Sequence, residues 1–389
     1  MQVSAPNPHA STLEQRVGAG RIFILADDLT GACDSGVAFL ACGRSVRVVL
    51  DTSSFNARDL QQAEAEGHET IWAFTTETRS LSPEHAGERF AASMSALYPA
   101  SQDALLFKKI DSAARGHLGL EIVEALRSSN AALALVAPAF PKAGRTVQFG
   151  VLSIRDCGGQ DATVPLHDLF PEVDAKDIDT LPAGTEQHLE QGIAQALANG
   201  TRILLCDAST QADLERLAAV ALAIRQPILW AGSAGLAHAL AGALPVSTSK
   251  PTPSSAHRHG RTLLFVGTPH PVTNLQVLHL EREPMMTERA IHRIQCGMTP
   301  EQEIIAAFAS APVSALILTG GDTASFVLCS LGASSIVLMG ELAAGIPWGY
   351  IEGGLADGCV VVTKSGGFGQ REALVRAFEF CERRSCEPA

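Results

Sequence analysis

The sequence predicts an α/β protein with two domains, each a mostly parallel sheet flanked by helices, and an active site in the cleft between them. Short runs rich in Val, Ile and Leu alternate with Ala-rich stretches of helical period, as in strand–helix units around a parallel sheet. The chain has 389 residues and is 46% hydrophobic, which is enough to bury two cores. Residues 244–260, rich in Pro, Ser and Thr, have the composition of a linker.

The first domain is expected over residues 20–243 and begins with the strand 21–26. Its other buried strands are expected at 45–50, 70–74, 104–110, 133–138, 202–206 and 227–232. Helical period between them predicts helices at 31–42, 83–97, 119–128, 187–198 and 211–224. The second domain, residues 261–389, is expected to contain strands at 262–267, 313–321, 334–340 and 359–369.

Composition and charge exclude several classes of protein. The net charge is −12 and the 29 basic residues are scattered, which argues against a nucleic-acid partner. The first 20 residues lack the apolar middle of a secretory signal, and no apolar run reaches the roughly 18 residues that cross a bilayer. Nine cysteines without a CxxC pair indicate reduced thiols in a cytoplasmic protein. Cys33 is expected to pack a helix and not to act as a nucleophile.

Two adjacent carboxylates, Asp27 and Asp28, follow the first strand directly. Ligands of open parallel sheets bind outside the carboxyl ends of the strands, so this position favours a binding site. One of the two can cap the helix that begins near Gly31. The other needs a cationic or hydroxyl-bearing partner, because adjacent like charges repel. We therefore expect at least one of them to face a ligand.

Other strand ends carry suitable partners for these carboxylates. Arg79 follows the strand 70–74, and the strand 104–110 ends in Lys108 and Lys109, followed by Asp111 and Arg115. Lys and Arg bind carboxylates, and Asp accepts hydrogen bonds from hydroxyls, so the combination suits a small hydroxy acid. A structural cluster of salt bridges is the alternative.

Three strands of the second domain run into loops rich in glycine or hydroxyl residues, at 265–274, 318–326 and 363–370. Glycine lets a backbone approach phosphate closely, and a following helix presents free N–H groups. Asp322 and Thr323 stand at such a helix start, where they either cap the helix or help to hold Mg²⁺ or ribose. The chain contains neither a P-loop nor a GxGxxG turn.

Seven motifs in order resemble those of the four-carbon acid sugar kinases. They are ADDLTGACD (26–34), TETR (76–79), KKIDSAARGHLG (108–119), PAFPKAGRT (138–146), GSAGLA (232–237), LTGGDTA (318–324) and TKSGGFG (363–369). The resemblance spans nearly the whole chain. It implies phosphorylation of the terminal hydroxyl of D-threonate by ATP, with D-erythronate and 3-oxo-tetronate as alternative acceptors.

The resemblance also implies which residues bind each substrate. The first domain would bind the sugar acid through Asp28, Arg79, Lys108, Lys109, Ile110 and Asp111. The second would bind ATP and Mg²⁺ through Thr268, Gly320, Gly321, Asp322, Thr323, Gly366 and Gly367.

In our hypothesis for the mechanism, Arg79 and either Lys108 or Lys109 bind the carboxylate of the acid. Asp28 would accept the proton of the reacting hydroxyl, with Asp111 as the reserve candidate. A sensor that binds the same ligands without catalysis is one alternative. A dehydrogenase acting on the same acids is another, disfavoured by the missing dinucleotide turn. The linker would permit a swapped or an ordinary homodimer.

Overall fold

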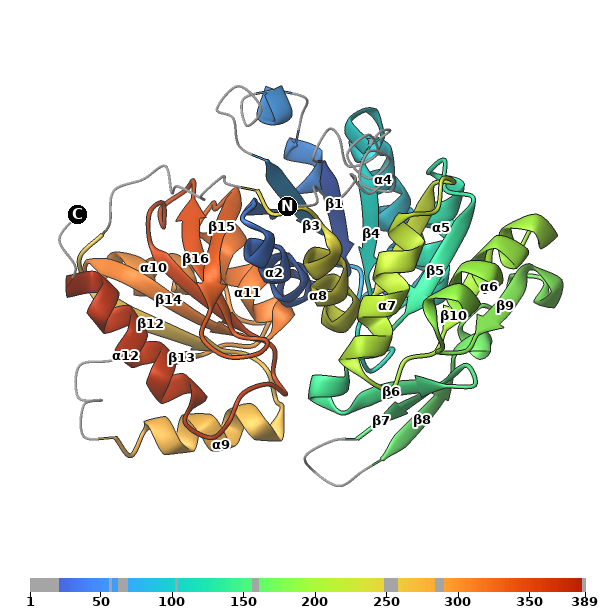
Figure 1. Cartoon of the computed structure of the whole chain (residues 1–389). Helices are drawn as coiled ribbons and strands as arrows, with labels where there is room; N and C mark the ends of the chain where they lie inside the picture. The colour runs from blue at the N-terminus through green and yellow to red at the C-terminus, as the bar shows by residue number, and fades with distance from the viewer. Residues whose placement is uncertain are drawn as a thin grey trace, which may run out of the picture.

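The computed structural model describes residues 21–55, 58–61, 69–101, 104–155, 161–247, 258–283 and 290–386. Strands from both halves of the chain form one 14-stranded sheet, with helices on its two faces (Figure 1). The strand order is β13-β12-β14-β17-β16-β15-β2-β3-β1-β4-β11-β5-β10-β9. The two sheets that we predicted are therefore two parts of this one sheet. Each part is mostly parallel, as expected, and the two are joined edge to edge.

The strands of the first half are β1 (Ile22–Ala26), β2 (Ser45–Val49), β3 (Thr70–Thr75), β4 (Leu105–Lys109), β5 (Leu133–Ala137), β9 (Ile178–Leu181), β10 (Ile203–Cys206) and β11 (Ile228–Gly232). They confirm the seven predicted apolar runs, and β9 was not predicted. All of them pair in parallel with their neighbours within this half. Every residue of β1 is buried, because helices cover both faces of a parallel sheet.

The second half adds six strands: β12 (Arg261–Val266), β13 (Ala290–Arg293), β14 (Val313–Thr319), β15 (Ser335–Glu341), β16 (Pro347–Glu352) and β17 (Val360–Lys364). We expected the last strand to continue to residue 369, but it ends at Lys364, before the SGGFG loop. β16 runs antiparallel to β15 and β17 and was not predicted.

Helices connect the strands in both halves. They are α2 (Leu29–Ala38), α4 (Pro83–Ser101), α5 (Leu118–Arg127), α6 (Glu186–Asn199), α7 (Gln211–Leu222), α8 (Ala234–Ala243), α9 (Pro271–Leu280), α10 (Glu301–Ala309), α11 (Gly321–Ser330) and α12 (Ala373–Cys386). The five helices expected in the first half are all present. Several begin at the side-chain caps that favour helix starts, such as Thr185, Thr210 and Ser233.

The two halves meet where β2 pairs antiparallel with β15. Arg47 of β2 donates a hydrogen bond to Glu352 of β16 at 2.9 Å, which adds an ion pair across this seam. Helices α2 and α11 also contact each other there. The seam brings the carboxyl end of β1 close to the glycine loops of the second half. Most of the predicted linker, residues 248–257, lies outside the described residues.

A small antiparallel sheet of β6 (Arg145–Gln148), β7 (Val151–Ile154) and β8 (Ala162–Pro165) extends from the first half (Figure 1). It was not predicted, because these strands are short and partly exposed. None of the described helices is long and apolar enough to cross a membrane. Cys33 is 0% exposed and burial raises its pKa to about 12, which agrees with the predicted packing role.

Candidate functional site

The candidate site is built around the end of β1, where Asp27 and Asp28 are both buried. Asp28 is the N-cap of α2, and its Oδ1 accepts a hydrogen bond from the N–H of Gly31 at 2.8 Å. Its Oδ2 accepts a hydrogen bond from the hydroxyl of Thr30 at 2.8 Å. The capping role that we expected for one of the two carboxylates therefore belongs to Asp28.

Arg79, which follows β3, is the cationic partner that the adjacent carboxylates require. Its Nε and Nη2 donate hydrogen bonds to the two oxygens of Asp27, each at 2.8 Å. Its Nη1 donates to Asp28 Oδ2 at 2.5 Å, and Asp111 Oδ1 lies 3.8 Å from Nη2. One guanidinium thus joins carboxylates from the ends of β1 and β4.

The charges in this cluster keep Asp27 and Asp111 ionised. Burial by itself opposes the ionisation of Asp27, but the charges of Arg79 and Lys108 outweigh it and lower its pKa. Burial also opposes the ionisation of Asp111, where the hydrogen bonds from Arg115 and the charge of Arg79 lower the pKa well below its usual range. A ligand would therefore meet anionic oxygens at this sheet edge.

The two lysines at the end of β4 have different surroundings, because successive side chains of a strand point to opposite faces. Lys108 is 1% exposed and forms an ion pair with Glu121 of α5 at 2.7 Å, with a side chain that is also 1% exposed. Lys109 lines the cleft described below, and its Nζ donates to the carbonyl of Ile110 at 2.9 Å. No carboxylate among the described residues lies within ion-pair distance of Lys109.

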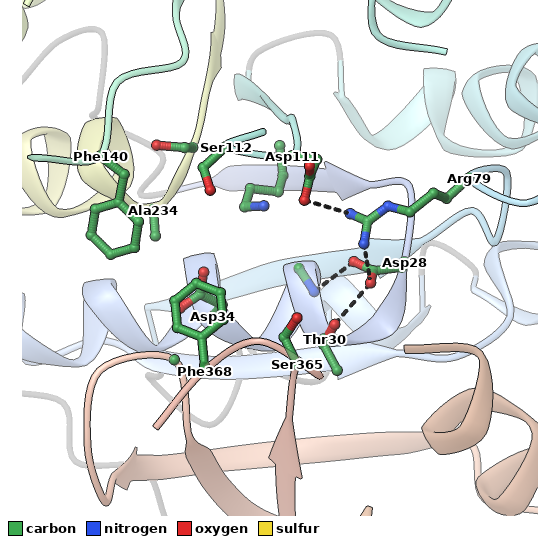
Figure 2. A pocket seen from close by; sticks show the side chains of 14 residues that line it. Asp28, Thr30, Asp34, Arg79, Asp111, Ser112, Phe140, Ala234, Ser365 and Phe368 are labelled. Atoms are coloured by element: carbon green, nitrogen blue, oxygen red, sulfur yellow. Dashed lines mark hydrogen bonds and ion pairs between the residues drawn. The ribbon is translucent and has the colours of Figure 1, made fainter. Parts of the chain in front are cut away.

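A cleft lies in front of these strand ends, between the two halves of the chain (Figure 2). It has about 390 Å³ of empty space, which includes space open to solvent. Its lining from the first half is Asp28, Thr30, Gly31, Asp34, Arg79, Lys109, Asp111, Ser112, Phe140, Ser233 and Ala234. The second half contributes Gly345, Ser365 and Phe368.

The cleft includes four of the predicted acid-site residues, Asp28, Arg79, Lys109 and Asp111. The other three, Lys108, Ile110 and Arg115, are not part of its lining. Ile110 is 1% exposed in the core, and its N–H donates to the carbonyl of Gly232. Arg115, with a 58% exposed side chain, donates two hydrogen bonds to Asp111 from outside the cleft, at 2.8 and 2.7 Å.

Asp34 belongs to the lining but was not predicted as a site residue. It stands on α2, one to two turns after Asp28, and helical spacing was the signal that could have placed it near the site. Burial raises the pKa of Asp34 to about 6, and the charges of Glu341 and Asp28 add to this effect, while Lys109 opposes it.

The glycine loop before α11 reaches the same cluster from the second half. A Cβ at Gly321, the first residue of α11, would collide with Asp28 Oδ2 and would lie 3.0 Å from Asp28 Cγ. The free N–H groups of a helix start are therefore next to the Asp28 carboxylate. The N-cap of α11 is Gly320, which has a φ of 96° and provides no side-chain cap.

Three loops of the second half converge behind this helix start. A Cβ at Gly320 would lie 3.1 Å from Thr268 Cβ, and one at Gly366 would lie 2.6 Å from Thr268 Oγ1. A Cβ at Gly367 would lie 3.2 Å from His270 Nε2. Thr268 therefore sits between the glycine loops after β14 and β17, as a composite phosphate site requires.

The remaining predicted residues of this half lie at the same helix start. Thr323 is 2% exposed in the first turn of α11, and a Cβ at Gly320 would lie 3.5 Å from its Oγ1. Burial raises the pKa of Asp322, and the negative charge of Asp28 raises it further. The charges of Asp322 and Asp28 are therefore near enough to influence each other.

Lys364 at the end of β17 holds its own loop. It is 1% exposed, and burial lowers its pKa to about 7. Its Nζ donates to the carbonyls of Ser365 and Gly366 at 2.9 and 3.2 Å and to the hydroxyl of Thr273 at 3.1 Å. All three of its donors thus have partners in and around the SGGFG loop.

The described residues contain no group of three or more His, Cys, Asp or Glu side chains that could hold a metal ion. Asp322 nevertheless stands in the first turn of α11. Mg²⁺ is commonly held by one or two carboxylates together with substrate phosphates, so this residue fits a metal that enters with a nucleotide.

Two family models match the chain. Residues 22–240 match a model described as a sugar-binding N-terminal domain, and residues 301–374 match one described as a nucleotide-binding C-terminal domain. The first match covers the strands that build the acidic cluster, and the second covers α11 and the SGGFG loop.

Curated relatives are similar over nearly the whole chain. A D-threonate kinase of Bordetella bronchiseptica is 29% identical, covering 95% of this chain and 99% of its own. A D-threonate kinase of Cupriavidus necator is 30% identical, covering 92% of this chain and 97% of its own. A solved structure from Salmonella typhimurium LT2 shares the fold, with a TM-score of 0.67 at 19% identity, and covers 92% of this chain and 98% of its own.

Proposed function

The chain belongs to the four-carbon acid sugar kinase family, and on this basis we propose that it transfers the γ-phosphate of ATP to the terminal hydroxyl of D-threonate. The observation that carries the proposal is the contact of the helix start at Gly321 with Asp28. It brings backbone N–H groups suited to phosphate next to a carboxylate suited to a hydroxyl. D-threonate is favoured because two D-threonate kinases are 29% and 30% identical over most of the chain, whereas the 3-oxo-tetronate kinases that match over most of the chain are 22–26% identical.

We assign the sugar acid to residues 20–243 and the nucleotide to residues 261–389, joined by the linker 244–260. In the first domain, Lys109 receives the carboxylate of the acid, since no carboxylate among the described residues pairs with it. Arg79 orients Asp28 and contacts the acid. Asp111 and Ser112, which also line the cleft, accept hydrogen bonds from its hydroxyls. Lys108 instead stabilises the fold through Glu121.

Asp28 accepts the proton of the terminal hydroxyl in this proposal. The oxygen of that hydroxyl forms a bond to the γ-phosphorus, the bond from the γ-phosphorus to the bridging oxygen breaks, and ADP leaves with that electron pair. Asp111 is less suited as the base, because the hydrogen bonds from Arg115 and the charge of Arg79 lower its pKa.

The nucleotide phosphates are assigned to the backbone of Gly320, Gly321, Asp322 and Thr323, with Thr268, Gly366 and Gly367 around them. This assignment is supported by the convergence of these loops at the start of α11. Mg²⁺ would neutralise phosphate charge, and Asp322 is the residue that would help to hold it. Because the cytoplasm supplies ATP, we also assign the proposed reaction to the cytoplasm. That the chain forms a homodimer remains a prediction.

The proposal is tested by incubating the purified chain with ATP, Mg²⁺ and, separately, D-threonate, L-threonate, D-erythronate and 3-oxo-tetronate. We expect ADP to form fastest with D-threonate, and mass spectrometry to find one phosphorylated acid for each ADP. If no acid stimulates ADP formation, the proposed kinase is wrong. Thermal stabilisation by an acid in that case would indicate the non-catalytic sensor.

A further inference from the structure

Two aromatic rings lie at one end of the cleft, and they come from opposite halves of the chain. Figure 2 shows Phe140 and Phe368 together at the end of the cleft away from Arg79 and Asp28. Phe140 stands in the loop after β5, and Phe368 in the loop after β17. The cleft therefore has a charged end and an aromatic end.

Phe140 is held firmly by its backbone and is 3% exposed. Its N–H donates to the carbonyl of Arg145 at 2.9 Å, and its carbonyl accepts from the N–H of Arg145 at 3.1 Å. The N–H of Ala143 donates to the same carbonyl at 2.9 Å. These hydrogen bonds fix the backbone of Phe140, and the burial of its side chain holds the ring, so the ring forms a fixed wall of the cleft.

Phe368 is fixed from two sides. Its ring packs against Gly345, where a Cβ would lie within 2.9 Å of three ring atoms, and Gly345 has a φ of 74°, which favours glycine. The amide of Gln276, a 0% exposed side chain of α9, donates to the carbonyls of Phe368, Gly369 and Gln370 at 2.9 to 3.1 Å. This ring is therefore a second fixed wall.

The position of these walls limits the length of an acid that reacts at Asp28. When the terminal hydroxyl is at Asp28, an acid that extends along the cleft brings its carboxylate closer to the two rings with each additional carbon. An aromatic face is the negative side of the ring quadrupole and repels an anion. A carboxylate placed there also loses hydration, and the two rings offer it no hydrogen-bond donor.

We propose that Phe140 and Phe368 set the upper length of the sugar acid at four carbons, a specificity role for two residues that the sequence motifs did not assign. The inference rests on the proposed function, because it takes Asp28 as the place of the reacting hydroxyl. Removing either ring opens the aromatic end and gives a longer acid room for its carboxylate and the water around it.

The test compares kcat/KM for D-threonate, D-ribonate and D-gluconate in the wild type, Phe368→Ala and Phe140→Ala. The matched control is Phe149→Ala, whose ring is 87% exposed at the turn between β6 and β7. We expect the ratio of kcat/KM for D-ribonate to that for D-threonate to rise at least tenfold in a cleft variant and to stay unchanged in the control. An unchanged ratio in both folded cleft variants overturns the proposal.

Binding measured without ATP separates this inference from the proposed function. The shift in melting temperature caused by each acid should show that D-ribonate stabilises Phe368→Ala but not the wild type. If the wild type phosphorylates no four-carbon acid but this binding difference is found, the kinase proposal fails and the length limit stands. If Phe368→Ala does not fold, Phe368→Leu takes its place, and the absence of any gain in D-ribonate binding contradicts the limit.

Discussion

Gly321 lies so close to Asp28 that the first turn of α11 and the carboxylate at the end of β1 form a single contact between the two halves of the chain. Asp28 also caps α2, so one side chain stands at the start of two helices. Both helix starts favour a negative charge. When a phosphate occupies the α11 start, it is placed beside the residue that we propose as the base.

Replacing Gly321 tests this contact. Gly321→Ala places a Cβ against the Asp28 side chain, so this side chain and α11 must move apart. We expect the rate of ADP formation to fall at least tenfold and the free energy of unfolding to fall by about 1–3 kcal/mol. Steady-state kinetics and denaturant unfolding measure the two effects.

The control for that variant is Gly242→Ala in α8, where a Cβ would meet no atom within 4 Å. This change should leave activity unaltered and stabilise the fold by roughly 0.5–1 kcal/mol, because alanine is the better helix former. Equal kinetics for Gly321→Ala and Gly242→Ala would show that the contact with Asp28 has no functional role.

The two lysines of β4 should respond differently to substitution. Lys108→Met leaves the Glu121 charge buried without its partner, so we expect a loss of about 3–5 kcal/mol in the free energy of unfolding. Lys109→Met removes no ion pair of the described residues, so its main effect should be on the acid: the KM for the acid should rise at least tenfold.

The double variant Lys108→Met/Glu121→Leu is the control for the first of these changes. It removes both buried charges, so most of the lost stability should return. If Lys108→Met raises the KM for the acid while the double variant does not restore stability, Lys108 serves the substrate and our assignment of the two lysines is reversed.

The raised pKa of Asp34 predicts a pH dependence of stability. Its pKa is about 6 in the folded chain against a usual value of 3.8, so the folded state binds more protons than the unfolded state between these values. The stabilising contribution of Asp34 is complete below about pH 3.8 and is lost as the pH rises through 6. Asp34→Asn does not titrate, so it does not lose this contribution. Its free energy of unfolding should therefore gain on the order of 1 kcal/mol over that of the wild type as the pH rises across this range.

Urea unfolding of both proteins at several pH values from 4 to 8 measures that difference. The free energy of unfolding of Asp34→Asn minus that of the wild type should increase up to about pH 6 and then stay constant. A difference that does not vary with pH would mean that Asp34 has an ordinary pKa in the folded chain.

Much of the fold could be predicted from local sequence. The strands β1, β5 and β11 are continuous apolar runs, and their ends agree with the prediction to within a residue. The antiparallel strand β16 and the pairing of β2 with β15 were not predicted. Strand neighbours in a sheet depend on contacts distant in sequence, and a single apolar run contains no information about its partner.

The candidate site, like the fold, could be predicted only in part from the sequence. Asp28, Arg79, Lys109 and Asp111 were predicted because parallel strand ends converge at one edge of a sheet. Strand alternation separates Lys108 from Lys109, but the strand register was needed to decide which one faces the cleft. The rings of Phe140 and Phe368 could not be predicted as cleft residues, because loops 228 residues apart in sequence bring them together.

The central claim is that Asp28 accepts the proton of the acid hydroxyl while the start of α11 holds the phosphates. Asp28→Asn tests it most directly, with Asp174→Asn, an exposed carboxylate, as the control. Calorimetry should show that the variant still binds ATP and D-threonate within a few-fold of the wild type. A single-turnover measurement should show that phosphoryl transfer slows by about 10²- to 10⁴-fold. Transfer at nearly the wild-type rate by a folded Asp28→Asn protein would contradict the claim.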